Sequence, residues 1–514
     1  MTTQVAAPSI AGLVGRFVVP VRLIFLVGLF AAALGIRLFH VDDPPLSFHA
    51  TRQYRSLLLA RHYYLEMTGS GQAWERDVAA LSAERQGVLE PPLLEHVVSL
   101  GYWFTGGESM WLPKVLSSIF WLIGGVWLYR IARRLAGSDA AIVSTAFYLF
   151  LPFAVLASRS FQPDPLMVMA LLGSLLAMLR YTEHPSAARL CLSAGASALA
   201  VLVKPMALFP LLCAFLALSI ARQGVAMTVR SPMTVAFALF MVVPMAVVYI
   251  YGLLSGTFLV GEAEKTLLPQ LLVSPFFWAH WADNIGAVVS FPVVLAALVG
   301  TALLKQPSSM ALMLGAWVGY VLFCLAVNYN LATHDYYQLQ LIPIAALGLA
   351  PLAAALGRWF VARQKSTALL RCAGWSALAV VVAIAMTRSE SRLGMTSLNQ
   401  EAQVAEQIGA EVQHSTRTIY LAADYGVPLE FHGRLSGRAW PLASDLEWEQ
   451  LTGVQQLSAE QRFQAWFARD KPEYFIVLDL TELDNQPDLK DFLIRNFVLV
   501  TRAPEYWLFD LRQV

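Results

Sequence analysis

The chain has 514 residues, of which 57% are hydrophobic and only 14% are charged, and its formal net charge is +1. Soluble proteins carry roughly 25% charged residues, so this composition excludes an ordinary cytosolic enzyme and a disordered chain. A net charge near zero does not support a nucleic-acid partner, which needs a dense basic face. The four cysteines lie in apolar stretches, which favours buried thiols over a disulfide-stapled domain. These features predict a polytopic membrane protein.

Apolar stretches recur along the first three quarters of the chain, and a bilayer-spanning helix takes about 20 such residues. The stretches are 21–39, 111–128, 140–156, 165–179, 190–203, 206–220, 233–253, 285–304, 311–327, 339–356 and 368–385. The two stretches on either side of Lys204 are short. We therefore expect a mainly α-helical bundle of about eleven transmembrane helices.

The distribution of basic residues predicts the orientation of the bundle. Lys and Arg gather in alternate loops, for example at Arg130, Arg133 and Arg134 and again at Arg358 and Arg363. Because positive charges mark cytoplasmic loops, we expect the N-terminus inside and, with an odd number of spans, the C-terminus outside. The first apolar stretch also resembles a signal sequence, and its cleavage would still leave the following segment outside.

Two regions lack the pattern of membrane helices and are expected on the exterior side. Residues 40–110 form a long loop with amphipathic pieces at 52–64, 74–85 and 93–104. The polar residues 388–514 alternate helical patterns (400–413 and 459–468) with strand patterns (418–422, 474–480, 497–501 and 506–511). Such interleaving predicts a small α/β domain. We thus expect a membrane domain over 1–387, which includes the loop, and an exterior α/β domain over 388–514. The exterior domain has no GxGxxG, P-loop or CxxC motif.

Polar residues in or near the bilayer carry the functional prediction, because hydrocarbon penalises them by about 2.5–3.5 kcal/mol at mid-depth. In the predicted topology such residues share the exterior face. They are Asp42, Asp43, His49, Arg52, Gln53 and Glu90 in the first loop, Arg159 and Asp164 before the fourth span, Lys204 before the sixth, and then His280, His334, Tyr336 and Tyr337.

The chemistry of these side chains suits a phosphorylated substrate, although structural roles also explain several of them. Carboxylates and imidazoles serve as general bases or cation ligands. Arg52, Arg159 and Lys204 are suited to neutralise a phosphate. Alternatively, Asp164 begins a helix, Lys204 extends to the membrane interface, and the tyrosines belong to an aromatic belt. No single motif decides between these interpretations.

Several short motifs follow one another in a specific order along the chain. They are Glu90-Pro91-Pro92-Leu93, Trp111-Leu112-Pro113-Lys114 leading to Tyr129-Arg130-Ile131, Arg159 with Asp164-Pro165, Leu202-Val203-Lys204-Pro205, and Tyr336-Tyr337-Gln338 ahead of Ile342-Pro343. In this order they resemble the C-type (GT-C) membrane glycosyltransferases, in particular the protein O-mannosyltransferase-like and lipid A aminoarabinose-transferase-like group. The resemblance covers about the first three quarters of the chain and is weak in the exterior domain.

The resemblance implies transfer of a hexosyl or pentosyl group from a polyprenyl phosphate carrier to an acceptor hydroxyl, with inversion at the anomeric carbon. It places the reaction at the outer face of a bacterial cytoplasmic membrane, with a protein, lipid A or a cell-envelope polysaccharide as acceptor. In such enzymes an Asp of the first loop is the base. Here Pro45-Leu46-Ser47-Phe48 leads into His49-Ala50 in place of the usual Asp-Glu pair. Either His49 takes the base position or Asp42 or Asp43 reaches in, and we favour His49 because imidazoles exchange protons near neutral pH.

The predicted site has two sets of residues and one optional metal. The catalytic set is His49, Asp42, Asp43 and Asp164, and the substrate-binding set is Arg52, Gln53, Arg159, Lys204, His334, Tyr336 and Tyr337. Glu90 and His280 are the candidate ligands of a divalent cation, a role that the aminoarabinose-transferase resemblance implies for Glu90. Two alternatives stay open: a transporter or flippase of a lipid-linked substrate, and an inactive membrane scaffold. The chain shows no pair of related halves, as many transporters do, whereas the missing Asp-Glu pair is compatible with a scaffold.

Overall fold

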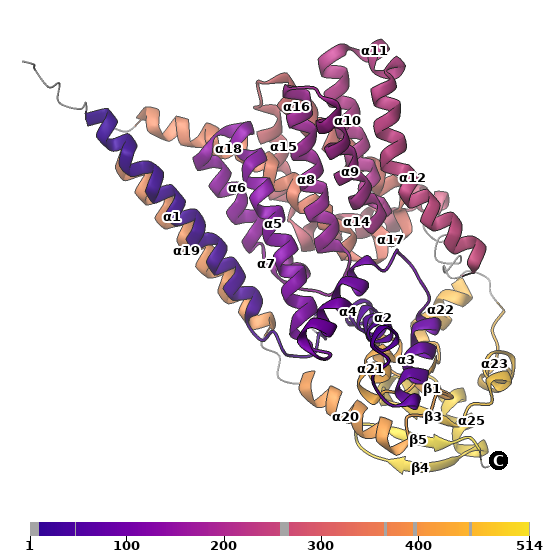
Figure 1. Ribbon diagram of the computed structural model, residues 1–514. Coiled ribbons are helices and arrows are strands. Elements are labelled where there is room, and N and C mark those ends of the chain that lie inside the picture. Colours follow the sequence, from indigo (N-terminus) through magenta and orange to yellow (C-terminus); the bar gives the residue numbers. More distant parts are fainter. Residues whose placement is uncertain are drawn as a thin grey trace, which may run out of the picture. The chain divides into compact units, whose positions relative to one another are not determined.

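The computed structural model describes residues 10–46, 48–256, 267–363, 367–393, 398–451 and 455–512. The chain divides into two compact units (Figure 1). Unit 1 comprises Met1–Val41, Lys114–Arg159 and Pro163–Leu393. Unit 2 comprises Asp42–Pro113, Ser160–Gln162 and Gly394–Val514. Packing therefore groups the long first loop with the C-terminal segment, and a separate domain over 388–514 stays a proposal.

Unit 1 is helical throughout its regular elements. In chain order these are α1 (Ile10–Leu38), α5 (Trp111–Ala136), α6 (Ser138–Phe150), α7 (Pro152–Ser158), α8 (Asp164–Glu183), α9 (Ala187–Val203), η1 (Pro205–Ala207), α10 (Leu208–Gln223), α11 (Val225–Arg230), α12 (Pro232–Ser255), η2 (Pro269–Val273), α14 (Pro275–Val288), α15 (Phe291–Ala302), α16 (Pro307–Ala326), α17 (Asn328–Thr333), η3 (Asp335–Gln340), α18 (Leu341–Arg363) and α19 (Thr367–Leu393).

The long helices of unit 1 confirm the predicted membrane bundle. Within the described ranges, seven helices are long and apolar enough to span a membrane, or nine if each of two bent pairs counts as one span. Each apolar stretch predicted from the sequence overlaps at least one helix, including the shorter α9 and the polar-ended α19. The protein is thus a mainly α-helical integral membrane protein with a small C-terminal sheet, and the number of eleven spans stays a prediction.

Two predicted spans are bent in the structure. α6 and α7 meet at 62° where Pro152 begins the second helix, because proline lacks the N–H that would continue the first. α14 and α15 meet at 83° across Val289 and Ser290, where Ser290 has φ 74°. The straight span expected over 285–304 is therefore wrong in its extent, since its first residues belong to α14.

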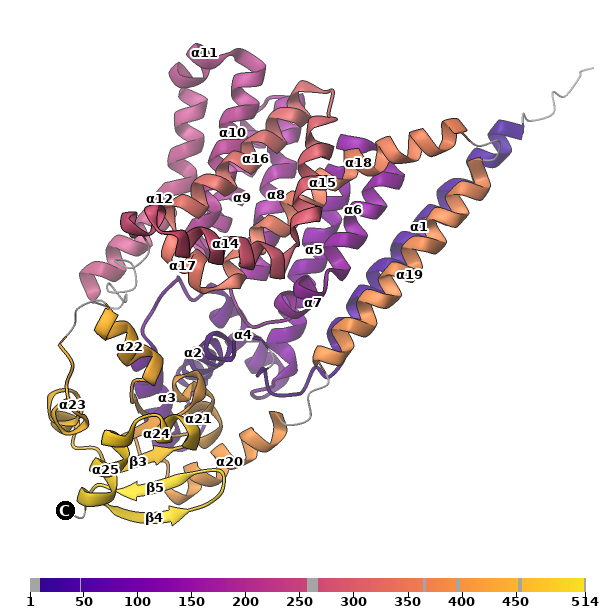
Figure 2. The ribbon, with the colours of Figure 1, turned by 180° about the vertical axis from the view of Figure 1, so that it is seen from behind.

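Close helix packing in unit 1 depends on small residues. A Cβ added to Gly315 of α16 would lie 2.6 Å from Cα of Ala214 in α10, so these backbones touch directly. Small residues favour such approach between membrane helices because dispersion contacts replace the hydrophobic effect there. α1 and α19 lie side by side in both views (Figures 1 and 2), and the rings of Phe25 and Trp375 are 5.2 Å apart.

Unit 2 combines a mixed five-stranded sheet with short helices (Figure 2). The strand order is β2-β1-β3-β5-β4, with β1 parallel to β2 and β3 and with β5 antiparallel to β3 and β4. The elements are α2 (Ala50–Thr68), α3 (Ala73–Gln86), α4 (Leu93–Thr105), α20 (Leu398–Glu411), β1 (Thr418–Leu421), η4 (Ala423–Gly426), α21 (Val427–Gly433), β2 (Gly437–Ala439), α22 (Ala443–Leu451), α23 (Ala459–Trp466), η5 (Ala468–Asp470), β3 (Tyr474–Val477), α24 (Leu480–Asp484), α25 (Pro487–Asn496), β4 (Val498–Arg502) and β5 (Trp507–Asp510).

The sheet has an apolar core on each face. Ile419 and Leu421 of β1 pack into one cluster with side chains of α23, α24 and α25, whereas Tyr420 between them packs into a second cluster with α20 and α21. This alternation follows from the two-residue period of a strand. The C-terminal residues thus form the α/β layers expected from the sequence.

The first loop packs onto α21 within the same unit. The Tyr54 hydroxyl lies 2.7 Å from Nε2 of His432, and the Arg61 guanidinium donates to the carbonyl of Phe431 at 2.7 Å. A further bond joins the hydroxyl of Thr51 to the carboxylate of Asp424 at 2.8 Å. The three amphipathic pieces predicted in the loop lie within α2, α3 and α4, and α2 supplies all three of these contacts.

Candidate functional site

The site residues predicted from the sequence fall in both units. Unit 1 contains Arg159, Asp164, Lys204, His280, His334, Tyr336 and Tyr337, and unit 2 contains Asp42, Asp43, His49, Arg52, Gln53 and Glu90.

A buried ion pair joins Lys204 to Asp164 in unit 1. The Lys204 ammonium donates to both carboxylate oxygens, at 2.8 and 2.9 Å, and the two side chains are 2% and 1% exposed. Asp164 is the first residue of α8, where the helix dipole favours a carboxylate, and Lys204 follows the last residue of α9. Pro205 prevents α9 from continuing. The pair therefore lies where one apolar helix begins and its neighbour ends.

Aromatic side chains from a distant segment cover this ion pair. The Lys204 nitrogen is 5.0 Å from the ring centroid of Tyr336 and 4.6 Å from that of Tyr337, within the range of cation–π attraction. The ring of His334 lies 5.4 and 6.1 Å from these two tyrosine rings. Within unit 1 the fold thus brings together five predicted residues, Asp164, Lys204, His334, Tyr336 and Tyr337.

The charge of Lys204 is compensated by its partner. The side chain is almost fully buried in the protein, and Asp164 does begin a helix, as its alternative interpretation expected. An ammonium has three N–H donors, and Asp164 accepts two of them. One N–H is left for a further acceptor while the pair stays intact.

Arg159 anchors the turn that follows α1. Its guanidinium donates to the carbonyls of Phe39 and His40 at 2.6 and 2.8 Å, and the side chain is 6% exposed. Arg37, which the sequence analysis missed, is fully buried and donates to Ser158 and to two main-chain carbonyls. The signal that would have found it is an arginine within an apolar stretch, which is rare and functional or structural when it occurs.

Arg52 and Glu90 bind each other in unit 2. One guanidinium nitrogen of Arg52 lies 2.9 and 3.0 Å from the two carboxylate oxygens of Glu90. His280 is exposed, and its Nδ1 lies 3.0 Å from the carbonyl oxygen of Phe276. Among the residues that the structure describes, no group of three or more His, Cys, Asp or Glu side chains gathers to hold a metal. Glu90 belongs to unit 2 and His280 to unit 1, and a divalent cation held by these two residues stays a prediction.

Gln53 has main-chain partners at both ends of its amide. Its nitrogen donates to the carbonyls of Pro45 and Phe48 at 3.2 and 2.5 Å, and its oxygen accepts from the N–H of Phe161 at 3.0 Å. The side chain is 3% exposed. Gln53 therefore holds the segment that carries His49, which is a positioning role; its predicted contact with substrate stays a prediction.

The three candidate bases lie between α1 and α2. Asp42 is exposed, whereas Asp43 and His49 are partly buried. His49 precedes α2 with φ 44°, a conformation that is uncommon for a non-glycine residue. Its ring and that of Phe48 form a T-shaped pair with centroids 4.6 Å apart. Ser47 of the predicted motif lies outside the described residues. Backbone outliers of this kind cluster at functional sites, which is in keeping with the predicted role of His49 as the base.

Three buried glutamines carry amide atoms without a hydrogen-bond partner among the described residues. Both amide atoms of Gln162 lack one, as do the nitrogen of Gln338 and the oxygen of Gln340. Buried polar groups are nearly always hydrogen-bonded, so these amides mark positions where a polar ligand or water would be favourable. The sequence analysis did not include these three residues in the predicted site, although Gln338 belongs to the motif Tyr336-Tyr337-Gln338.

Comparisons with known proteins bear on the fold. Residues 89–251 match the family described as dolichyl-phosphate-mannose-protein mannosyltransferase, a range that contains Glu90, Arg159, Asp164 and Lys204. The crystal structure of ArnT from Cupriavidus metallidurans bound to undecaprenyl phosphate superposes with a TM-score of 0.51 at 16% sequence identity, covering 94% of this chain and 97% of that one. The chain has the GT-C fold.

The GT-C fold is also shared with other solved structures. ArnT from Cupriavidus metallidurans in the apo state gives the same TM-score, identity and coverage. The archaeal oligosaccharyltransferase AglB from Archaeoglobus fulgidus, in complex with an inhibitory peptide and a dolichol-phosphate, superposes with a TM-score of 0.50 at 12% sequence identity. The match covers 88% of this chain and 69% of that one. No curated protein sequence matches the chain. The GT-C resemblance predicted from the sequence is therefore confirmed at the level of the fold.

Proposed function

We propose that the protein is a membrane glycosyltransferase that moves a sugar from a polyprenyl phosphate to an acceptor hydroxyl at the outer face of the cytoplasmic membrane. The observation that carries this proposal is the convergence of Lys204, Asp164 and the segment 334–337 at the ends of apolar helices in a GT-C fold. A substrate with a lipid tail and a charged head needs such an arrangement, because the tail stays in hydrocarbon while the head meets polar groups.

The phosphate of the donor is recognised by cationic side chains. Lys204 offers its third N–H while Asp164 keeps it in place, and Arg159 of the same unit adds a guanidinium group that suits phosphate oxygens. Arg52 of unit 2 is proposed as a further phosphate ligand from its chemistry alone. The ArnT structure holds undecaprenyl phosphate and the AglB structure holds a dolichol-phosphate, which supports a polyprenyl phosphate as the class of carrier. Tyr336 and Tyr337 supply ring faces for the sugar or the first lipid units.

The reaction proceeds with inversion. The base, His49 or one of Asp42 and Asp43, takes the acceptor proton while the acceptor oxygen forms a bond to the anomeric carbon. The bond between that carbon and the phosphate oxygen breaks, and the phosphate leaves with its electron pair. The cationic groups act chiefly on this leaving charge, because preorganised electrostatics are usually the largest catalytic contribution.

The sugar, hexosyl or pentosyl, and the acceptor are to be found by experiment. Purified full-length protein in lipid nanodiscs receives a polyprenyl phosphate carrying a radiolabelled sugar, together with protein, lipid A or polysaccharide acceptors. We expect release of polyprenyl phosphate and label on one acceptor. Lys204→Met is expected to lower turnover by about 10²–10³-fold, as for loss of one transition-state donor. Lys305→Met, at an exposed lysine of the same unit, is the matched control.

Two outcomes contradict the proposal. Movement of the intact donor across a sealed vesicle membrane without cleavage would identify a transporter. Neither movement nor cleavage with any donor tested, from protein that remains folded, would identify a scaffold.

A further inference from the structure

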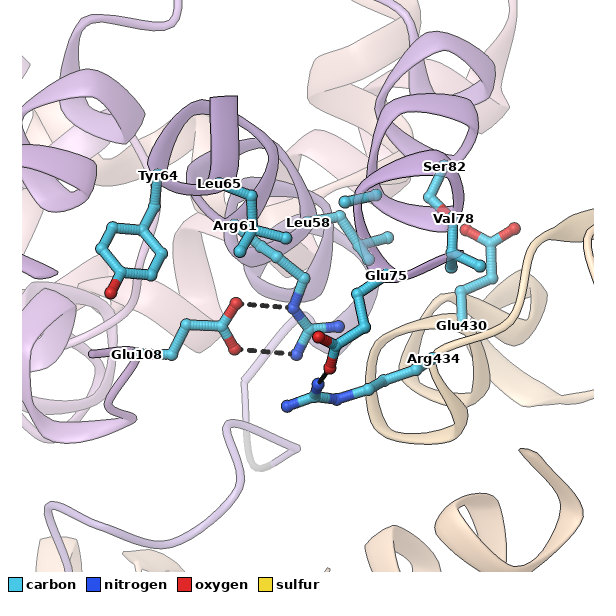
Figure 3. Close-up of a pocket in the computed structure, with 11 residues that line it drawn as sticks. Leu58, Arg61, Tyr64, Leu65, Glu75, Val78, Ser82, Glu108, Glu430 and Arg434 are labelled. Atoms are coloured by element: carbon cyan, nitrogen blue, oxygen red, sulfur yellow. Dashed lines mark hydrogen bonds and ion pairs between the residues drawn. The ribbon is translucent and has the colours of Figure 1, made fainter. Parts of the chain in front are cut away.

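A pocket of about 290 Å³ lies within unit 2, and none of the residues proposed for sugar transfer lines it. Its walls come from α2 and α3, from Glu108 in the loop after α4, and from Glu430 and Arg434 around the end of α21 (Figure 3). The volume lies just below the range of about 300–1,000 Å³ that is typical of ligand pockets. It has room for one small ring and not for a chain.

The charged side chains of the pocket are paired across it. Arg61 and Glu108 form a bidentate ion pair with N–O distances of 2.7 and 3.0 Å, and Glu75 forms an ion pair with Arg434 (Figure 3). The Arg61 side chain is 9% exposed and also donates to the carbonyl of Phe431. An additional charged ligand would have to break one of these pairs, which leaves the abandoned partner without its counter-charge.

A neutral ligand with hydroxyl groups meets no such obstacle. A guanidinium has five N–H donors and a carboxylate about four acceptor sites, so these paired groups keep free donors and acceptors for a hydroxyl. Leu58, Leu65 and Val78 provide an apolar wall, and Tyr64 lies beside Glu108. Polar groups on one side and apolar ones on the other match the hydroxyl edge and the C–H face of a pyranose.

Glu430 completes the pocket with less negative charge than an ordinary carboxylate. Its carboxyl accepts from the Tyr420 hydroxyl, the Gly437 N–H and the Gln86 amide. Burial raises the pKa of Glu430 to about 7. A carboxyl with this pKa is only about half ionised near pH 7, so its pull on a cation is weaker than that of an ordinary carboxylate, which is in keeping with an uncharged occupant.

We propose that this pocket binds a single uncharged sugar ring, such as the terminal pyranose of a glycan. That the glycan is the acceptor rests on the proposed function, whereas the binding itself does not. The pocket thereby gives the protein a carbohydrate-recognition site in addition to the residues assigned to sugar transfer.

Ligand-observed NMR on the full-length protein in nanodiscs free of sugar-headed detergents tests this binding. The probes are methyl α-glucoside, methyl α-mannoside and methyl α-galactoside. We expect saturation transfer from the protein to at least one of them, concentrated on the C–H protons of the ring. Leu65→Trp fills the pocket and should abolish the signal. Met67→Trp, at an exposed position of the same helix, is the matched control and should leave it unchanged.

Three results would overturn the proposal. They are absence of saturation transfer to every pyranoside, a signal that survives Leu65→Trp in a folded protein, and stronger binding of glucuronate or glucosamine than of the neutral sugars. Donor cleavage is measured separately with water as acceptor. A protein that binds pyranosides without cleaving donor disproves the transferase proposal alone, and one that cleaves donor without binding pyranosides disproves the pocket proposal alone.

Discussion

Lys204 and Asp164 are 40 positions apart in the chain, yet the ammonium lies within 2.9 Å of both carboxylate oxygens and both side chains are almost fully buried. Taking two charges out of water costs free energy, which their attraction only partly returns, whereas breaking such a pair is strongly destabilising. The ion pair therefore ties the first residue of α8 to the residue that follows the end of α9, whatever its role in chemistry.

Removing one member of this pair should destabilise the protein. Lys204→Met leaves a buried carboxylate without its cation, so we expect the free energy of unfolding to fall by about 3–5 kcal/mol. The double variant Lys204→Met/Asp164→Leu should lose less than this single variant because no charge is left unpaired. Unfolding in mixed micelles measures both. If the double variant loses as much free energy of unfolding as Lys204→Met and Asp164→Leu together, the two residues do not stabilise each other as a pair.

Replacement of the true base should reduce turnover without weakening donor binding. His49→Ala, Asp42→Asn and Asp43→Asn are tested separately, and loss of a general base is expected to cost about 10²–10⁴-fold. His62→Ala, at a partly exposed histidine of α2, is the control for the loss of an imidazole. If all three variants keep full turnover, the base lies elsewhere.

Gln53→Ala should destabilise the segment that carries His49. The substitution leaves the carbonyls of Pro45 and Phe48 and the N–H of Phe161 without their partner. We expect a loss of about 1–3 kcal/mol for unsatisfied buried groups, seen in unfolding experiments and as faster amide exchange at residues 45–50. Stability and exchange equal to the parent protein would show that Gln53 does not position this segment.

The stability of unit 2 should depend on pH through Glu430. Its pKa is raised from 4.5 to about 7 by burial, so the folded chain holds a proton that the unfolded chain has lost between these values. Stability from this group is therefore full below about pH 4.5 and falls as the pH rises to about 7. Glu430→Gln removes this dependence. The stability of the variant relative to the parent should rise by up to about 3 kcal/mol across the window.

His432 gives the opposite slope and must be separated from Glu430. Burial lowers the pKa of His432 from 6.5 to about 4, so the unfolded chain binds the extra proton and stability falls as the pH decreases from 6.5 to 4. The two slopes partly cancel in the parent protein. For this reason the difference between Glu430→Gln and the parent is the quantity to follow, and a difference that stays constant from pH 4.5 to 7 would contradict the assignment.

The membrane helices were predictable because a bilayer imposes length and apolarity on each of them. The bends at Pro152 and at Ser290 each have a proline at the start of the helix that follows, Pro152 in α7 and Pro292 in α15, but the angle of each bend depends on local backbone geometry. In unit 2 the strands β1, β3, β4 and β5 were predicted. The three-residue β2 and the short helices α21, α22, α24 and α25 were not, although the buried residues Leu489, Phe492 and Leu493 of α25 do repeat at a helical spacing.

Part of the candidate site was predictable because Asp164 and Lys204 are charged residues in apolar surroundings. Their mutual pairing was not predictable, since a charge suited to phosphate is equally suited to a carboxylate of the same chain. The same holds for Arg52 with Glu90. The pocket of unit 2 left no local signal, because Arg61, Glu108 and Arg434 come together only through tertiary contacts.

The three chain segments that make up unit 2 also restrict how many times the chain crosses the membrane between them. Its three segments, Asp42–Pro113, Ser160–Gln162 and Gly394–Val514, pack as one body, so they must lie on one side of the bilayer. The chain therefore traverses the bilayer an even number of times between the first and second segments and again between the second and third. α5 and the α6–α7 pair are long and apolar enough to supply the first two passages. The bent α14–α15 pair either crosses the bilayer once or enters and leaves on the same side. If it leaves on the same side, one further described helix between α8 and α19 must also not cross, so that the number of passages stays even.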